Sequence, residues 1–168
     1  MDSSNFSFEE SQSFTQWYIW LLLIGLNLLF LFGIYKQAIL GEAFGNKPAS
    51  TLVLSFVWIP VLLITVFFFM IRLDTKINKE GVHVRFFPIH RKFKKHEWDD
   101  IREAKVRKYR PLLEYGGWGI RGIGRNRALN VKGNIGLQLV FNDGKKLLIG
   151  TQKKEELDLV IKSLRESN

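Results

Sequence analysis

Three glycines in the second half of the chain, Gly117, Gly119 and Gly122, have the G-x-G-x-x-G spacing of a dinucleotide-binding loop. Asp143 follows at about the distance where such a fold places the acid that binds the ribose, ~20 residues on. The motif works only between a strand and a helix, because the pyrophosphate binds the N–H groups at the start of that helix. Residues 123–134 contain more glycine and asparagine and no apolar helical stripe. We therefore expect a glycine-rich β-turn or bulge here and no nucleotide cofactor.

The three histidines of the chain, His83, His90 and His96, are the next candidates for chemistry. No acid or cysteine near them completes a recognised metal-ligand set. We therefore expect surface or half-buried histidines and no metal site.

The densest acids come shortly after the histidines. A pair of carboxylates can act as general acid and base only in a pocket that moves their pKa values apart. Lysines and arginines surround these acids in the sequence, so a solvated cluster of ion pairs is the expected arrangement. The chain also has no Ser/His/Asp order, Walker loop or HExxH motif. We expect no catalytic residues and a protein that is not an enzyme. The acids concerned are Glu97, Asp99, Asp100 and Glu103.

Charge and apolar residues are distributed unevenly along the 168 residues. Residues 1–71 have a net charge of −2, whereas residues 72–168 have a net charge of +11 and most of the Lys and Arg. Most Leu and Phe lie in the first part. There is no cysteine, so disulfides and thiolate metal sites are excluded. The two parts are therefore expected to face different surroundings.

Two apolar stretches are long enough to cross a membrane. They lie at residues 17–38 and 51–71, and a loop at residues 41–50 with Gly, Asn and Pro joins them. About 20 helical residues span a hydrocarbon core of about 30 Å, and only a helix satisfies its own backbone hydrogen bonds there. Residues 17–71 are therefore predicted to form an antiparallel transmembrane hairpin. Asn27 is expected to form an interhelical hydrogen bond, and Pro60 to be tolerated as a kink.

The distribution of bases gives this hairpin a direction. Arg72, Lys76 and Lys79 follow the second stretch at once, whereas the connecting loop has the single base Lys47. The positive-inside rule then places the C-terminal side in the cytoplasm, and two crossings return residues 1–16 to the same side. That first segment has acids and no base, which is not typical of a cleaved signal peptide. The prediction is a multi-pass protein of the inner cell membrane with both termini cytoplasmic.

Residues 72–168 show the alternation that is typical of strands. Strands are predicted at residues 82–87 and 102–109, and a hairpin at residues 137–149 turns at Asn142-Asp143-Gly144. A short strand is expected around residues 92–94, and a turn or single helical turn at residues 97–101.

The last segment has helical spacing instead. Thr151 can cap a helix with apolar residues at i, i+3, i+4 and i+7. The order is thus about six or seven antiparallel strands followed by one amphipathic helix. Hairpins without intervening helices favour bent antiparallel sheets or a partly open barrel. The apolar residues of the helix are Leu157, Val160, Ile161 and Leu164.

Four segments carry a resemblance to a known fold: residues 73–87 (LDTKINKEGVHVRFF), 96–101 (HEWDDI), 115–121 (YGGWGIR) and 133–152 (GNIGLQLVFNDGKKLLIGTQ). They resemble the pleckstrin-homology (PH) superfold. Together with the apolar stretches, the chain resembles bacterial membrane proteins that carry a PH-like domain after two transmembrane helices. The resemblance implies a PH-like domain at residues 72–168 and binding linked to a membrane. It implies no catalytic residues.

The basic excess suggests what such a domain would bind. Only a few residues separate the second apolar stretch from the first strand, so the domain is expected near the inner leaflet, whose anionic lipids attract Lys and Arg. Nucleic acid is a less favoured partner. An aromatic residue and several bases in the glycine-rich stretch are the candidate contacts. They are Trp118, Arg121, Arg125, Arg127 and Lys132.

We therefore expect a membrane-anchored, non-catalytic binding or adaptor module. It would present a basic PH-like domain to anionic lipid headgroups or to a membrane protein partner. The alternative is a structural or accessory subunit of a larger membrane protein complex. A third hypothesis, an enzyme on the cytoplasmic face, has no support from the motifs. The bases also have a simpler explanation, which is that they set topology and solubility.

Overall fold

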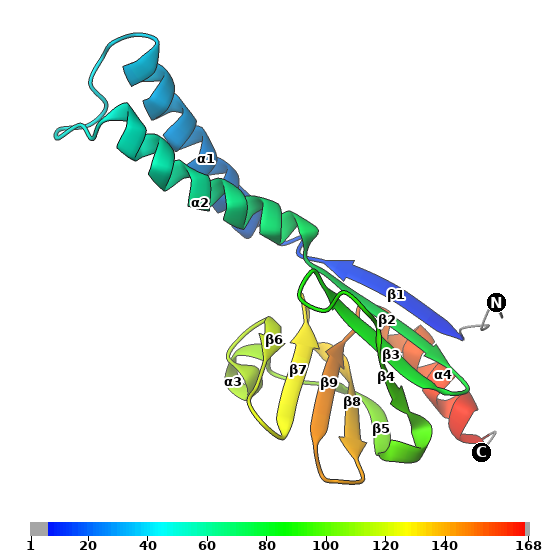
Figure 1. Ribbon diagram of the computed structural model, residues 1–168. Helices are drawn as coiled ribbons and strands as arrows, with labels where there is room; N and C mark the ends of the chain where they lie inside the picture. The colour runs from blue at the N-terminus through cyan, green and yellow to red at the C-terminus, as the bar shows by residue number, and fades with distance from the viewer. Residues whose placement is uncertain (1–6, 167–168) are drawn as a thin grey trace. The chain divides into compact units, whose positions relative to one another are not determined.

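The computed structural model describes residues 7–166 and divides the chain into two compact units (Figure 1). The first unit, which we call the helix pair, is Thr15–Met70. The second, which we call the β domain, combines the segment that ends at Phe14 with the segment that begins at Ile71. The β domain therefore takes its strands from both sides of the helix pair in the sequence.

The helix pair consists of α1 (Trp17–Ala38) and α2 (Thr51–Met70). Both helices are long and apolar enough to cross a membrane. Their bounds agree with the predicted stretches to within one residue, because an apolar run of this length is a local property of the sequence.

Asn27 joins the two helices, as predicted. Its Nδ2 donates to Thr65 Oγ1 on α2 at 2.8 Å, and its Oδ1 accepts from Trp58 Nε1 at 3.1 Å. Pro60 lies inside α2, which continues through it to Met70. The predicted interhelical hydrogen bond of Asn27 is thus confirmed, and Pro60 is tolerated inside the helix.

The first sheet of the β domain has four antiparallel strands in the order β1-β2-β3-β4. They are β1 (Phe8–Ser13), β2 (Arg72–Asn78), β3 (Gly81–Phe87) and β4 (Lys94–Glu97). The predicted strand at 82–87 is confirmed. The short strand expected around 92–94 instead begins at Lys94. Residues 1–16 were expected to form a segment apart from the domain, yet residues 8–13 are its first strand, and Ser13 pairs with Arg72.

β1 is held by polar residues that point inward. Phe8, Glu10 and Gln12 alternate with exposed neighbours. Glu10 Oε2 accepts from Thr151 Oγ1 at 2.6 Å, and Gln12 Nε2 donates to the Gly150 carbonyl at 2.7 Å. Because two of the three inward side chains are polar, the strand lacks the apolar alternation by which strands are recognised in a sequence.

The second sheet has five strands in the order β5-β8-β9-β7-β6. Its β8–β9 hairpin turns at Asn142-Asp143-Gly144 as predicted, and the strand expected at 102–109 is β5. β7 and β9, however, run parallel, whereas all pairs were expected to be antiparallel. The strands are β5 (Ile101–Lys108), β6 (Gly119–Arg121), β7 (Asn126–Asn130), β8 (Ile135–Phe141) and β9 (Lys146–Gly150).

The described residues therefore contain nine strands in two open sheets, where six or seven were expected. The additional strands are β1 and two short strands in the glycine-rich stretch. Three helical segments complete the domain: the 3₁₀ turn η1 (Trp98–Asp100), the short α3 (Pro111–Tyr115) and α4 (Lys154–Glu166). The turn at 97–101 and the C-terminal amphipathic helix are thus confirmed, and α3 was not predicted.

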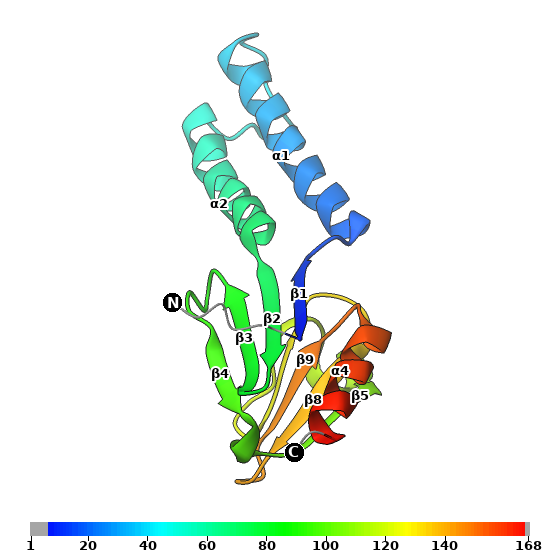
Figure 2. The ribbon, with the colours of Figure 1, turned by 90° about the vertical axis from the view of Figure 1, so that its right-hand side faces the viewer.

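The core of the β domain is formed by apolar side chains of both sheets and of α4. Leu157 and Ile161 of α4 are buried, and the helix packs against β5 and β1 (Figure 2). The largest fully buried side chains on the strands are Phe8, Leu73, Ile77, Phe86, Leu137, Leu139, Leu148 and Ile149.

The two ends of the β domain differ in what they carry. At the end that we call the helix-linked end, β1 stops at Ser13 and β2 begins at Arg72. Gln12 bonds to Gly150, so the end of β9 also lies at this end. The β8–β9 and β5–β8 pairings then place the start of β8 at Ile135 and the end of β5 at Lys108 there as well. The opposite, far end holds the β2–β3 and β8–β9 turns, since η1 lies between them and bonds to both.

Candidate functional site

A cleft of about 670 Å³ lies between the two sheets of the β domain. Six exposed cations from β4, β7, β9 and the adjoining turns line it, against the two acids Asp100 and Asp143. We call it the basic cleft. His90, His96, Leu129, Phe141 and Leu147 supply less polar parts of its wall. Its cations are Lys94, Lys95, Arg125, Arg127, Lys145 and Lys146.

The loop that carries Arg125 is tied to the β8–β9 turn. The Lys146 N–H donates to the Arg125 carbonyl at 2.7 Å, and the Arg125 guanidinium donates to the Asp143 carbonyl. Gly122 makes this loop possible, because its φ of +80° favours glycine and an added Cβ would lie 2.0 Å from the Asn126 carbonyl oxygen. Two segments distant in sequence are thereby fixed on one side of the cleft.

Some of the six cations already have anionic partners. Lys95 Nζ lies 2.9 Å from Glu80 and 3.2 Å from Glu97. Lys145 pairs with Asp143, and this contact lowers the pKa of the Asp143 carboxyl. Within residues 7–166, the other four make no ion pair, and Arg125 bonds only to a backbone carbonyl. Lys94, Arg125 and Arg127 give the cleft its uncompensated positive charge. Lys146 also lines a hollow with Glu103 and Glu114, on the opposite face of the second sheet from Arg127.

The histidines of the cleft are neutral near pH 7. Burial of the ring, followed by the charge of Lys94, lowers the pKa of His96 to about 4. Burial also lowers the pKa of His90, and Arg127 and Lys94 add to that effect. Arg127 and Lys94 belong to different sheets and line the same cleft, so the cleft brings bases of both sheets together. His96 Nε2 is buried without a hydrogen-bond partner.

The predicted contact residues are divided among different places. Arg125 and Arg127 line the basic cleft, whereas Trp118, Arg121 and Lys132 do not. Arg121 Nε donates to the Trp118 carbonyl at 2.7 Å, and Trp118 Nε1 donates to the Gly133 carbonyl at 2.9 Å. The Lys132 carbonyl accepts from Gln152 Nε2 at 3.1 Å. The sequence thus identified two of the cleft's cations.

The other cations of the cleft come from β4 and from the β8–β9 hairpin. Lys94 and Lys95 belong to a basic cluster that is evident in the sequence. Its position opposite Arg127 depends on how the two sheets face each other, which no local pattern shows. Lys145 and Lys146 follow a recognisable turn, and the register of the hairpin alone does not indicate which sheet they meet.

A second surface surrounds α3, and we call it the α3 patch. It is a hollow of about 600 Å³ whose wall is mainly apolar. Leu112 and Leu113 are exposed at its rim, by 66% and 78%. Its other lining residues are Lys108, Tyr109, Arg110, Pro111, Glu114, Trp118 and Asn134.

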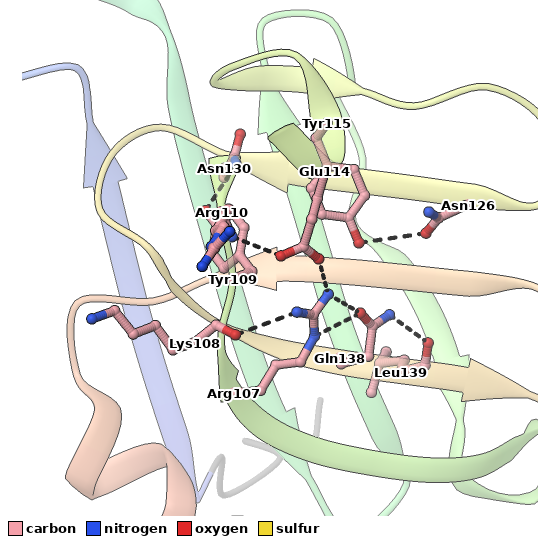
Figure 3. A network of polar contacts seen from close by, with 10 residues as sticks. All are labelled: Arg107, Lys108, Tyr109, Arg110, Glu114, Tyr115, Asn126, Asn130, Gln138 and Leu139. Carbon is pink, nitrogen blue, oxygen red and sulfur yellow. Dashed lines mark hydrogen bonds and ion pairs between the residues drawn. The ribbon is translucent and has the colours of Figure 1, made fainter. Parts of the chain in front are cut away.

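A polar network holds α3 against the second sheet (Figure 3). Arg107 on β5 donates to Glu114 Oε2 at 2.7 Å and to Gln138 Oε1 at 3.0 Å. Glu114 Oε1 also accepts from the Arg110 N–H at 2.7 Å. These contacts lower the pKa of Glu114, with the Arg107 hydrogen bond as the largest cause. The carboxylate is therefore charged near pH 7 and fixes the start of α3.

Two tyrosines complete the attachment of α3. Tyr115 is buried and meets Tyr109 edge to face, with ring centroids 6.0 Å apart. The Tyr109 hydroxyl accepts from Asn130 Nδ2 at 2.8 Å. Burial raises the pKa of both tyrosines. With Tyr115 turned inward, Leu112 and Leu113 remain on the outer side of this short helix.

A scan against protein-family models gives no match for this chain, and a search of curated proteins gives no significant match either.

Proposed function

We propose that this chain is a membrane-anchored, non-catalytic binding module whose β domain binds an anionic group in the basic cleft. The carrying observation is the convergence of Lys94, Arg125 and Arg127 on one cleft without ion-pair partners within residues 7–166. Like charges held together repel each other, and an anion relieves that repulsion. Arginine matches phosphate and carboxylate with two parallel hydrogen bonds.

The membrane part of the proposal rests on the helix pair. Two apolar helices, a connecting loop with one base, and a basic segment after α2 support insertion with the β domain in the cytoplasm. The pairing of β1 with β2 adds a topological argument. Since both strands belong to one sheet, the chain must leave and re-enter on the same side of the membrane.

The PH-like identity of the β domain is part of this proposal. Two mostly antiparallel sheets followed by a C-terminal helix support it. The parallel β7–β9 pair and a first strand from before the helices are departures from the simple meander of strands that the sequence suggests. A PH-like module that binds an anion is compatible with both departures, because neither β1 nor the β7–β9 pairing closes the basic cleft.

The anion has two possible sources, a lipid headgroup phosphate and an acidic segment of a membrane protein partner. The test uses the full chain in nanodiscs, because β1 precedes the helices and a fragment that starts at residue 72 lacks a strand. Hydrogen exchange of β4 and residues 124–127 is compared in phosphatidylcholine and phosphatidylglycerol discs. Glycerol phosphate and an acidic peptide are then titrated into the neutral discs by calorimetry.

A triple variant, Lys94→Gln, Arg125→Gln and Arg127→Gln, removes the unpaired charge of the cleft. Three cations at about 1 kcal/mol each correspond to about a hundredfold weaker binding. The matched control removes the same charge from exposed bases outside the cleft. Equal weakening by both triples, or no response to any anion, would contradict a site in the cleft. The control substitutions are Lys79→Gln, Arg102→Gln and Lys154→Gln.

A structural or accessory subunit of a larger membrane complex is the alternative proposal. The outer surfaces of both helices are apolar, as at Leu21, Phe56 and Phe69, and suit a neighbouring helix as well as lipid. Crosslinking in native membranes followed by affinity purification tests this. Recovery of a stoichiometric partner supports it, and recovery of the monomer alone counts against it.

A further inference from the structure

The α3 patch presents two large apolar side chains that the fold does not bury. Leu112 and Leu113 are adjacent, and both are mostly exposed. Scattered exposed leucines are common, but two neighbours beside an apolar hollow form a continuous surface of the kind that marks an interaction site.

The fold holds these leucines outward. Tyr115 is buried against Tyr109, and Glu114 is fixed by Arg107 and by the Arg110 N–H. Turning Leu112 or Leu113 inward would require breaking the ion pair and exposing the tyrosine. The exposure of the two leucines is therefore fixed by the way α3 is attached to the sheet.

The surroundings of the leucines indicate the kind of partner. Trp118 lies in the same hollow, and the exposed bases Lys108 and Arg110 are on its rim. Leucine that inserts among acyl chains, tryptophan at headgroup level and bases that meet phosphate are the combination found at an anionic membrane interface. A protein partner would not require all three to be adjacent.

The position of the patch in the β domain agrees with this. α3 follows the end of β5, at the helix-linked end. The loop after β3 begins at the same end, since Phe87 pairs with Arg72, and it exposes Ile89 beside Arg91 and Lys92. Two separate loops of this end thus combine an exposed apolar residue with bases.

The links between the β domain and the helices are short. Three residues separate β1 from α1, and Ile71 alone separates α2 from β2. Four extended steps reach about 14 Å at most. The strands of the helix-linked end are therefore joined to both helices by links of only one and three residues.

We propose that the α3 patch is a membrane-contact surface. Leu112 and Leu113 insert into the interface of the membrane that the helix pair crosses, and Lys108 and Arg110 bind the phosphates of its anionic lipids. This inference rests on the membrane anchoring in the proposed function and is independent of the basic cleft. It attaches the β domain to the membrane non-covalently, in addition to its two covalent links to the helices.

The absence of cysteine from the chain allows a direct test. Leu113→Cys carries a bimane label in the full chain, reconstituted in nanodiscs whose lipids bear a nitroxide near the headgroup. Leu159→Cys on α4 is the matched control, because Leu159 is also an exposed leucine of the β domain, at 68%. Leu29→Cys within α1 reports on anchoring itself.

We expect the nitroxide lipid to quench the label at 113 severalfold more than the label at 159. The difference is expected to be larger in phosphatidylglycerol than in phosphatidylcholine, and to shrink when Lys108→Gln and Arg110→Gln are added. Equal quenching at 113 and 159 would overturn the inference. Protection of the 113 label from iodide without lipid quenching would also overturn it, because a protein then covers the patch.

The label at 29 separates the two proposals. If it is quenched by nitroxides placed deep in the acyl chains while 113 behaves like 159, anchoring stands and the membrane contact of α3 fails. If the label at 29 is not quenched, the anchoring fails, and the α3 inference fails with it. Because all three side chains are exposed, the substitutions leave the packed core of the β domain unchanged.

Discussion

The pairing of β1 with the rest of the β domain makes a quantitative prediction about Phe8. Its side chain is 2% exposed, on a strand that precedes the helices in sequence. Truncation of a buried phenylalanine to alanine costs about 3–5 kcal/mol through lost burial and the remaining cavity. Small domains have a total stability of about 5–15 kcal/mol. Phe8→Ala should therefore remove a large share of the free energy of unfolding of the β domain.

The measurement is denaturant unfolding of the full chain in detergent, with hydrogen exchange of residues 72–78 as a local report. Ser13→Ala is the control on the same strand, because Ser13 is exposed and its loss should change stability by about 0.5 kcal/mol or less. If Phe8→Ala is as mild as Ser13→Ala and β2 keeps its protection, the assignment of β1 to this sheet is refuted.

Two shortened proteins test the same strand. Residues 71–168 alone lack β1, so we expect them to be less stable and to exchange faster at β2. Joining residues 7–14 to residue 71 by a short glycine-containing turn restores the strand, since Ser13 and Arg72 are already opposite each other. Equal stability of the two proteins would contradict the role assigned to β1.

Three further predictions concern His96, Asn27 and Glu114. Lowering the pH from 7 to 4.5 should destabilise the β domain, because His96 has a pKa of about 4 when folded and about 6.5 when unfolded, so unfolding takes up a proton in that window. This pKa shift corresponds to about 3.4 kcal/mol of unfolding free energy, which partial exposure of the ring reduces to about 1–2 kcal/mol. In denaturant titrations at both pH values, the His96→Gln variant should lose this part of the pH dependence. Asn27→Leu should lower the unfolding free energy of the helix pair by about 0.6–1.7 kcal/mol in steric-trapping measurements, with Leu28→Ala as an exposed control. Glu114→Gln should speed hydrogen exchange in α3 and leave exchange in α4 unchanged, since its ion pair with Arg107 would be lost.

The elements that were predicted correctly depend on local patterns. The two helices follow from long apolar runs, and the β8–β9 hairpin follows from alternation on both sides of an Asn-Asp-Gly turn. α4 follows from its apolar spacing and its acids in the first turn. In each case the residues that determine the element are neighbours in the sequence, so no tertiary information is needed.

The elements that were missed depend on distant contacts. β1 has Glu10 and Gln12 on its inner face, and only their bonds to Thr151 and Gly150 make those positions suitable for polar residues. β7 pairs in parallel with β9 across a loop that looks like a turn-rich segment. α3 has five residues, too few for a helical period to be evident.

The candidate site shows the same division. Arg125 and Arg127 were identified because they are bases in a glycine-rich stretch, which is a local property. Lys94 completes the cleft from β4 of the other sheet, and its approach to Arg127 depends on the packing of the two sheets. The leucines of the α3 patch carry no charge or motif, so only their exposure in the folded domain reveals them.

The position of β1 ahead of the helices also has a consequence for synthesis of the protein. β1 leaves the ribosome first, but its pairing partner β2 follows only after about 60 further residues. At 5–20 residues per second, that interval is roughly 3–12 s. During this time both apolar helices are synthesised while β1 has no β2 strand to pair with. The first sheet can therefore form only after both α1 and α2 have been synthesised.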